Sequence, residues 1–308
     1  MNDEKSFPEP YWLLKESDDK QMEFVVVLVS ELENGIDIAQ RCLYKNKISI
    51  DSINAMSDNN ATEFFITTTT KVAWKVFIEL LEAGHDFDCF VLPLEGREKK
   101  LLICDMDSTI VQTETLDDIA KFIGIGAQVS EITTRAMRGE LDFRKALDER
   151  VSLLEGISGN VFAEIAETVK FNEGAELLIN RARKHGIRTV LVSGGFEPVV
   201  KFVADKLGFD RYVCNKIEIA NGNLTGKVIE PIVDAETKLN VLQEECSQSG
   251  ISVELACAVG DGANDLPMLQ AAGIGVGFEA KPLVRSGTPY QVNYSNLISI
   301  LLMMGIAE

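Results

Sequence analysis

Three short polar loops, each placed directly after an apolar run with the length of a buried strand, constrain the fold of this 308-residue chain most strongly. They cover residues 104–109, 191–195 and 259–265, and they carry aspartates, two serines and several glycines. An open parallel sheet builds its site from loops at the carboxyl ends of its strands. The sequence therefore predicts an α/β enzyme with carboxylates and backbone amides gathered at one edge of a sheet.

The charge balance indicates what such a site handles. There are 30 Lys and Arg against 48 Asp and Glu, a formal net charge of -18. This excess argues against nucleic acid or an anionic membrane as a partner. The polar loops favour an enzyme that acts on phosphate, and a divalent cation would reconcile so acidic a protein with an anionic substrate.

The sequence favours a cytoplasmic location. The first 20 residues are polar and lack the features of a secretory signal. The longest apolar stretches, 24–29 and 297–306, are shorter than the ~20 residues that span a bilayer. The six cysteines show no C-x-x-C spacing, which favours reduced thiols in the core.

Residues 1–98 are expected to form a separate α+β domain. Between 22 and 93 the pattern is strand, helix, strand, strand, helix, strand, an order that fits a ferredoxin-like unit. It resembles the ACT domains that bind amino acids. Three roles stay open for this domain: binding an amino-acid effector, forming a homodimer, or a purely structural one.

A charged connection, 95–100, leads into the second predicted domain, residues 99–308. Strands and helices alternate there, which predicts a doubly wound parallel sheet. The pair Asn221-Gly222 predicts a hairpin within that order. Residues 115–170 contain only helical patterns, and we expect them to form a helical cap over the carboxyl edge.

Two prolines locate helix starts beside the polar loops. Pro198 is tolerated only in a first helical turn, so a helix begins near Phe196 and the amides of residues 193–195 can hold an anion. Pro267 places another helix start near Asn264.

The carboxylates and one lysine complete the predicted chemistry. Asp105 and Asp107 are two residues apart, so extended backbone would point both to one side. Asp261, with glycines beside it, suggests a metal ligand. With Asp234 as helix N-cap, Lys238 lies near the first turn, where a cation is disfavoured unless an anion is close.

Together these loops resemble the haloacid dehalogenase (HAD) superfamily of phosphotransferases, whose four motifs match residues 105–109, Ser193, Lys238 and residues 260–265 in order. The resemblance implies a HAD-like fold with an aspartate nucleophile. It assigns Asp105 and Asp107 as catalytic, with Mg²⁺ held by Asp105, Asp261 and the Asp107 backbone carbonyl. The further assignments are phosphate contacts from Ser193, Gly194 and Lys238, and orientation of the metal shell and lysine by Asn264 and Asp265.

Within that superfamily the chain resembles, over about residues 100–295, the enzymes that hydrolyse O-phospho-L-serine in the last step of serine biosynthesis. The resemblance implies that Glu114 binds the substrate ammonium and Arg150 its carboxylate, with Met137 and Phe143 closing the apolar side of the pocket. The alternatives are a phosphatase for phosphohomoserine or phosphoethanolamine, and a receiver-type signalling module. A receiver needs neither the helical insertion nor a second acid such as Asp107.

Overall fold

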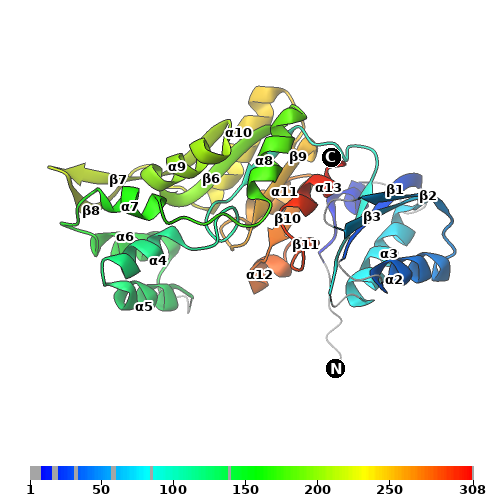
Figure 1. Cartoon of the computed structure of the whole chain (residues 1–308), viewed down its shortest axis with the longest axis horizontal. Coiled ribbons are helices and arrows are strands. Elements are labelled where there is room, and N and C mark those ends of the chain that lie inside the picture. Colours follow the sequence, from blue (N-terminus) through cyan, green and yellow to red (C-terminus); the bar gives the residue numbers. More distant parts are fainter. Residues whose placement is uncertain are drawn as a thin grey trace.

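A computed structural model describes residues 8–15, 20–30, 34–56, 60–83, 86–137 and 140–306. These residues form a four-stranded and a seven-stranded sheet, built from successive parts of the chain and lying side by side (Figure 1). None of the helices in the described ranges combines the length and the apolar character that crossing a bilayer requires.

The four-stranded sheet follows the predicted element order. Its strands are antiparallel and lie in the order β2-β3-β1-β4. The elements are β1 (Gln21–Val29), α2 (Asn34–Lys45), β2 (Ile50–Met56), β3 (Ala61–Thr69), α3 (Thr70–Ala83) and β4 (Asp88–Pro93). A short helix that the sequence analysis did not predict, α1 (Tyr11–Lys15), precedes them.

The seven-stranded sheet has the order β11-β10-β9-β5-β6-β7-β8. All neighbouring pairs are parallel except the β7–β8 hairpin, whose turn is the predicted Asn221-Gly222. The strands are β5 (Leu101–Cys104), β6 (Arg188–Phe196), β7 (Arg211–Ala220), β8 (Asn223–Ile229), β9 (Ala256–Gly260), β10 (Ile274–Phe278) and β11 (Tyr290–Val292). The chain leaves β5 toward β6 and later leaves β9 toward β10, on the opposite side. The topological switch point, where such sheets bind ligands, therefore lies between β5 and β9.

Helices cover both faces of this sheet because successive strand residues point to opposite faces. Leu101 and Ile103 pack in one core cluster with residues of α10 and α11, whereas Leu102 and Cys104 pack in the other with residues of α8 and α9. These helices are α8 (Ala175–Lys184), α9 (Glu197–Leu207), α10 (Ala235–Ser249) and α11 (Leu266–Ala271), followed by α12 (Pro282–Arg285) and α13 (Ile298–Met303). The predicted doubly wound sheet is confirmed.

The predicted insertion between β5 and β6 is helical. It contains α4 (Thr115–Phe122), α5 (Gly126–Met137), α6 (Phe143–Ser152) and α7 (Val161–Ala166). Figure 1 shows α4, α5 and α6 at the end of the core away from the four-stranded sheet. The loop at 156–159 joins the β7–β8 hairpin through backbone hydrogen bonds, among them Gly156 N to Leu224 O at 2.9 Å and Leu224 N to Ile157 O at 2.8 Å. The hairpin therefore ties this part of the insertion to the core.

Buried polar contacts join the two sheets. The Asp88 carboxylate accepts hydrogen bonds from the backbone amides of residues 293–295 at 2.8–3.1 Å. The Arg97 guanidinium pairs with Glu63 and donates to the carbonyls of Leu302 (2.5 Å) and Met303 (3.2 Å) at the end of α13. Since unpaired buried charges are costly, these contacts fix how the two sheets meet.

Candidate active site

The switch point brings the first and third polar loops together. Asp105 directly follows β5 and Asp261 directly follows β9, and the Asp105 amide donates to the Val259 carbonyl at 2.9 Å. Asp105 is 5% exposed and Asp261 is 4% exposed. The fold therefore holds two carboxylates out of bulk water at the edge where the sequence predicted a site.

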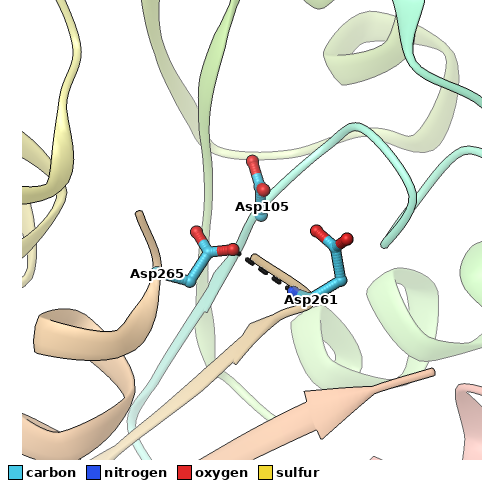
Figure 2. A group of neighbouring side chains, drawn as sticks. All are labelled: Asp105, Asp261 and Asp265. Carbon is cyan, nitrogen blue, oxygen red and sulfur yellow. Dashed lines mark hydrogen bonds between the residues drawn. The ribbon is translucent and has the colours of Figure 1, made fainter. Parts of the chain in front are cut away.

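A third carboxylate, Asp265, completes a compact group. Asp105, Asp261 and Asp265 each offer an oxygen, and these oxygens lie within 4.8 Å of one another (Figure 2). Asp265 Oδ2 accepts from the backbone amides of Asp261 (3.2 Å) and Gly262 (3.0 Å). A Cβ at Gly260 would come within 2.5 Å of the Asp265 side chain, so the close approach of these loops requires glycine there.

Lys238 is the counter-charge that the sequence predicted. Asp234 caps α10 through the Thr237 amide, and Lys238 in the next turn is fully buried. Its Nζ lies 2.7 Å from Asp105 Oδ1 and 2.6 Å from Asp265 Oδ1. Burial alone would lower the pKa of Lys238, but the two aspartates raise it above its ordinary value.

The carboxylates outnumber this cation. Burial and the neighbouring Asp265 hold the pKa of Asp105 well above its usual range, although Lys238 opposes them. Burial also raises the pKa of Asp261. Asp105 and Asp261 bring buried carboxylate oxygens together at this edge, with Asp265 beside them, and such oxygens are the donors that a hard divalent cation prefers. The residues present therefore fit Mg²⁺.

Asp107 is held apart from this group. Its Oδ1 accepts from the Thr115 amide at 2.8 Å and from the Thr115 hydroxyl, and its Oδ2 accepts from Ser193 Oγ at 3.3 Å. Burial, followed by the Glu114 charge, raises the pKa of Asp107 to about 6, against the opposing bonds from Thr115. Asp107 is thus a carboxyl that can hold a proton near neutral pH.

The second polar loop lies beside Asp107. Ser193 Oγ also accepts from the Gly195 amide at 2.8 Å, and α9 begins at Glu197 with Phe196 as N-cap, as Pro198 predicted. Asn215 anchors the loop, since its Nδ2 donates to Gly194 O at 2.8 Å and its Oδ1 accepts from Val233 N at 2.7 Å. The sequence analysis missed Asn215, which is one of several polar residues in β7 and carries no local signal of this role.

A cavity of about 410 Å³ lies between this sheet edge and the helical insertion. The predicted residues that line it are Asp105, Asp107, Glu114, Phe143, Arg150, Gly194, Asp261 and Asn264. Ser193, Lys238 and Asp265 are fully buried and are not in the lining. A larger cavity of about 520 Å³, between residues 8–11 and the α11–β10 region, contains none of the predicted site residues. We place the site in the smaller cavity, because it contains the carboxylates.

The insertion contributes the far side of the cavity. Arg150 of α6 is partly buried, and this burial lowers its pKa while Asp117 and Glu114 oppose that shift. Its Nε donates to Ala146 O at 3.1 Å, so this partly buried cation is available to a ligand anion through its remaining donors. Phe143 is 41% exposed at the start of the same helix. Met137 ends α5, and its side chain and residues 138–139 lie outside the described part of the chain.

Lys281 is a further cavity residue that the sequence analysis missed. Its Nζ lies 2.9 Å from Asp261 Oδ2 and 3.2 Å from Glu114 Oε1. No local pattern marks it, because Lys281 reaches the site only through the place of β10 beside β9, the strand that Asp261 follows.

Comparison with known proteins identifies the family. The model of the haloacid dehalogenase-like hydrolases matches residues 102–270. The phosphoserine phosphatase of Streptococcus thermophilus is 43% identical over 203 residues, which are 66% of this chain and 94% of that protein. The chain belongs to the haloacid dehalogenase-like hydrolase family. It is therefore an enzyme, and the receiver-type alternative is wrong.

Other members of this hydrolase family extend the similarity. The phosphoserine phosphatase of Saccharomyces cerevisiae is 34% identical over 299 residues, 92% of this chain and 97% of its own. A solved structure described as a phospho-aspartyl intermediate analogue of phosphoserine phosphatase is 36% identical, with a TM-score of 0.62, over 67% of this chain and 98% of its own. The first of these covers both sheets, whereas the second covers about two thirds of the chain.

Proposed function

We propose that the chain hydrolyses O-phospho-L-serine to L-serine and phosphate with Mg²⁺. The observation that carries this proposal is one cavity with Asp105 and Asp261 on its sheet side and Arg150 and Glu114 on its helical side. The sheet side suits a phosphate with a metal, and the helical side suits a carboxylate and an ammonium. The names of the relatives support the same substrate.

The metal is assigned to Asp105, Asp261 and the Asp107 backbone carbonyl, as the family resemblance implies. Bound there, Mg²⁺ would neutralise phosphate charge and orient the phosphorus. Both oxygens of Asp265 are engaged by Lys238 and by the amides of Asp261 and Gly262. We therefore assign Asp265 to the support of the metal site, with Asn264 beside it.

Asp105 is the proposed nucleophile. One carboxylate oxygen bonds to phosphorus while the bond from phosphorus to the serine oxygen breaks, which gives an aspartyl-phosphate. Water then attacks this phosphorus and frees Asp105 and inorganic phosphate. The solved phospho-aspartyl analogue of a relative supports this route.

Asp107 is the proposed acid and base. Its pKa of about 6 suits a carboxyl that gives its proton to the leaving serine oxygen and then takes one from the attacking water. Ser193 Oγ, the Gly194 amide and Lys238 would hold the transferring oxygens. Lys238 is well placed for this role because its Nζ already contacts Asp105.

Glu114 and Arg150 are the proposed selectivity residues. The substrate ammonium would pair with Glu114, and the guanidinium of Arg150 would form paired hydrogen bonds with the substrate carboxylate. Phe143 and Met137 are assigned to the apolar side of the substrate. Phosphoethanolamine has no carboxylate and would leave Arg150 without a partner.

The N-terminal assignment also belongs to this proposal. We propose a ferredoxin-like, ACT-like domain over residues 1–98 and a cytoplasmic hydrolase domain over 99–308 with its cap at 115–170. The observed strand order supports the first of these. Arg150→Ala weakens the binding of L-serine in the active site. If the N-terminal domain binds serine as an effector, calorimetry should therefore still detect L-serine binding to this variant. No residual binding would leave dimerisation or a structural role.

The substrate assignment is tested by phosphate release from phosphoserine and phosphoethanolamine, with Mg²⁺ or EDTA. Arg150→Ala should lower kcat/KM for phosphoserine by about 100-fold, because a charge contact in the partly buried cavity is lost, and leave phosphoethanolamine nearly unchanged. Arg144→Ala is the matched control, since Arg144 lies on the same helix and pairs with Glu230 outside the cavity. Equal losses on both substrates would contradict the assignment.

A further inference from the structure

Lys281 brings an ammonium group into the cavity, and none of the roles above uses it. It is the N-cap of α12, and its backbone amide donates to the Asp261 carbonyl at 2.9 Å. Its Nζ contacts Asp261 Oδ2 at 2.9 Å and Glu114 Oε1 at 3.2 Å, with the side chains of Lys281 and Glu114 about half exposed. The lysine thus joins Asp261 at the sheet edge to Glu114, the residue that directly precedes α4.

The partner of Lys281 is the carboxylate that is proposed to receive the substrate ammonium. A lysine side chain and the amino group of phosphoserine present the same alkylammonium charge. Glu114 Oε1 already accepts from Lys281 and, at 3.2 Å, from Ser108 Oγ. An incoming ammonium therefore has to compete with Lys281 for this oxygen.

The negative charge of the cavity explains how an ammonium on Glu114 could assist substrate binding. Its described lining carries the carboxyl groups of Asp105, Asp107, Glu114 and Asp261. A substrate with a phosphate and a carboxylate is repelled by such a surface until its ammonium is seated. A resident ammonium on Glu114 reduces that repulsion.

We propose that Lys281 is a specificity-determining positioning residue whose ammonium stands in for the substrate ammonium on Glu114 in the empty enzyme and yields this carboxylate when substrate binds. The proposal rests on the proposed function. It implies that Lys281 makes the enzyme more tolerant of phosphates without an ammonium than Glu114 alone would be.

The experiment compares phosphoserine with 3-phosphooxypropanoate, which is phosphoserine without its amino group. In Lys281→Met, the ratio of kcat/KM for phosphoserine over this analogue should rise about two- to fivefold, the range expected for a half-exposed ion pair. Lys121→Met is the matched control, because it removes a cap lysine that pairs with Asp118 rather than Glu114, and it should leave the ratio unchanged. In a Glu114→Gln background, Lys281→Met should no longer change the ratio.

Binding gives a second readout that does not depend on turnover. L-Serine carries the ammonium without the phosphate, so in EDTA its affinity for Lys281→Met should be about two- to fivefold tighter than for wild type by calorimetry. An unchanged ratio with unchanged serine affinity overturns the proposal, and so does a Lys281→Met effect that persists without Glu114. A wild-type enzyme that uses both phosphates equally contradicts the proposed function itself, because Glu114 then recognises no ammonium.

Discussion

Two polar regions of this molecule differ in how their charged side chains are neutralised. The contact between the sheets, formed by Glu63, Asp88 and Arg97, matches each charge with a partner. The carboxylate edge consists of Asp105, Asp261 and Asp265, with Lys238 against two of them and Asp107 next to the group, and it gathers charges of one sign. Burial raises the pKa of Asp105, Asp107 and Asp261. A surplus of one charge, rather than burial of charge as such, distinguishes the site from the scaffold.

The largest effect is expected from removal of Lys238, the buried cation of the carboxylate edge. Lys238→Met leaves Asp105 and Asp265 without it, so unfolding in urea with EDTA should show a loss of about 3–5 kcal/mol. Mg²⁺ should restore part of that stability. Lys227→Met, at an exposed position on β8, is the control and should change stability by less than about 0.5 kcal/mol. If Lys238→Met were as stable as wild type, repulsion among the buried carboxylates would not destabilise this edge, and the contrast would be wrong.

The pH dependence of stability tests Asp107. Its folded pKa of about 6 lies above the unfolded value of 3.8, so the folded state binds the proton more tightly. Ionisation therefore costs stability as pH rises through this window, by up to about 3 kcal/mol above pH 6. In EDTA, Asp107→Asn should be more stable than wild type at pH 7, and the difference should vanish below pH 4.

Asp142 provides a control of opposite sign for that measurement. The Lys145 amide lowers the pKa of this exposed N-cap carboxylate. Asp142→Asn should therefore lose stability relative to wild type as pH rises toward 4, and the difference should stay constant above pH 4. If Asp107→Asn follows the same direction, the assignment of Asp107 as a strained carboxyl is wrong.

The smallest effect is expected at the contact between the sheets. Asp88→Asn weakens the bonds to the amides of residues 293–295 and should cost about 1–2 kcal/mol in urea unfolding. Turnover of phosphoserine should stay within about twofold, because Asp88 is not among the residues that line the cavity. Asp86→Asn, an exposed neighbour, is the control. A large loss of kcat in Asp88→Asn would mean that the contact also acts on the site.

The sequence predicted those features of the fold that depend on residues adjacent in the chain. The hairpin at Asn221-Gly222, the helix starts set by Pro198 and Pro267, and the strand before Asp105 follow from local chemistry. The meeting of Asp105 and Asp261 was also predictable, since carboxyl ends of parallel strands lie at one edge, and Lys238 near the start of a helix indicated a nearby anion.

Contacts between remote parts of the chain were beyond that reasoning. Asp88 meets residues more than 200 positions away, and Asn215 looks like an ordinary strand residue until its bonds to Gly194 and Val233 are seen. Lys281 depends on the order of β9 and β10 in the sheet. Local patterns do not encode such pairings.

The most direct test of the central claim is chemical trapping at Asp105. Wild-type enzyme is mixed with phosphoserine and Mg²⁺, stopped in acid, and reduced with borohydride, which converts an aspartyl-phosphate to homoserine. Peptide mass spectrometry should then find homoserine at position 105 and aspartate at 107, and Asp105→Asn should release no phosphate above background. Reduction at another residue, or steady turnover by Asp105→Asn, would contradict the account.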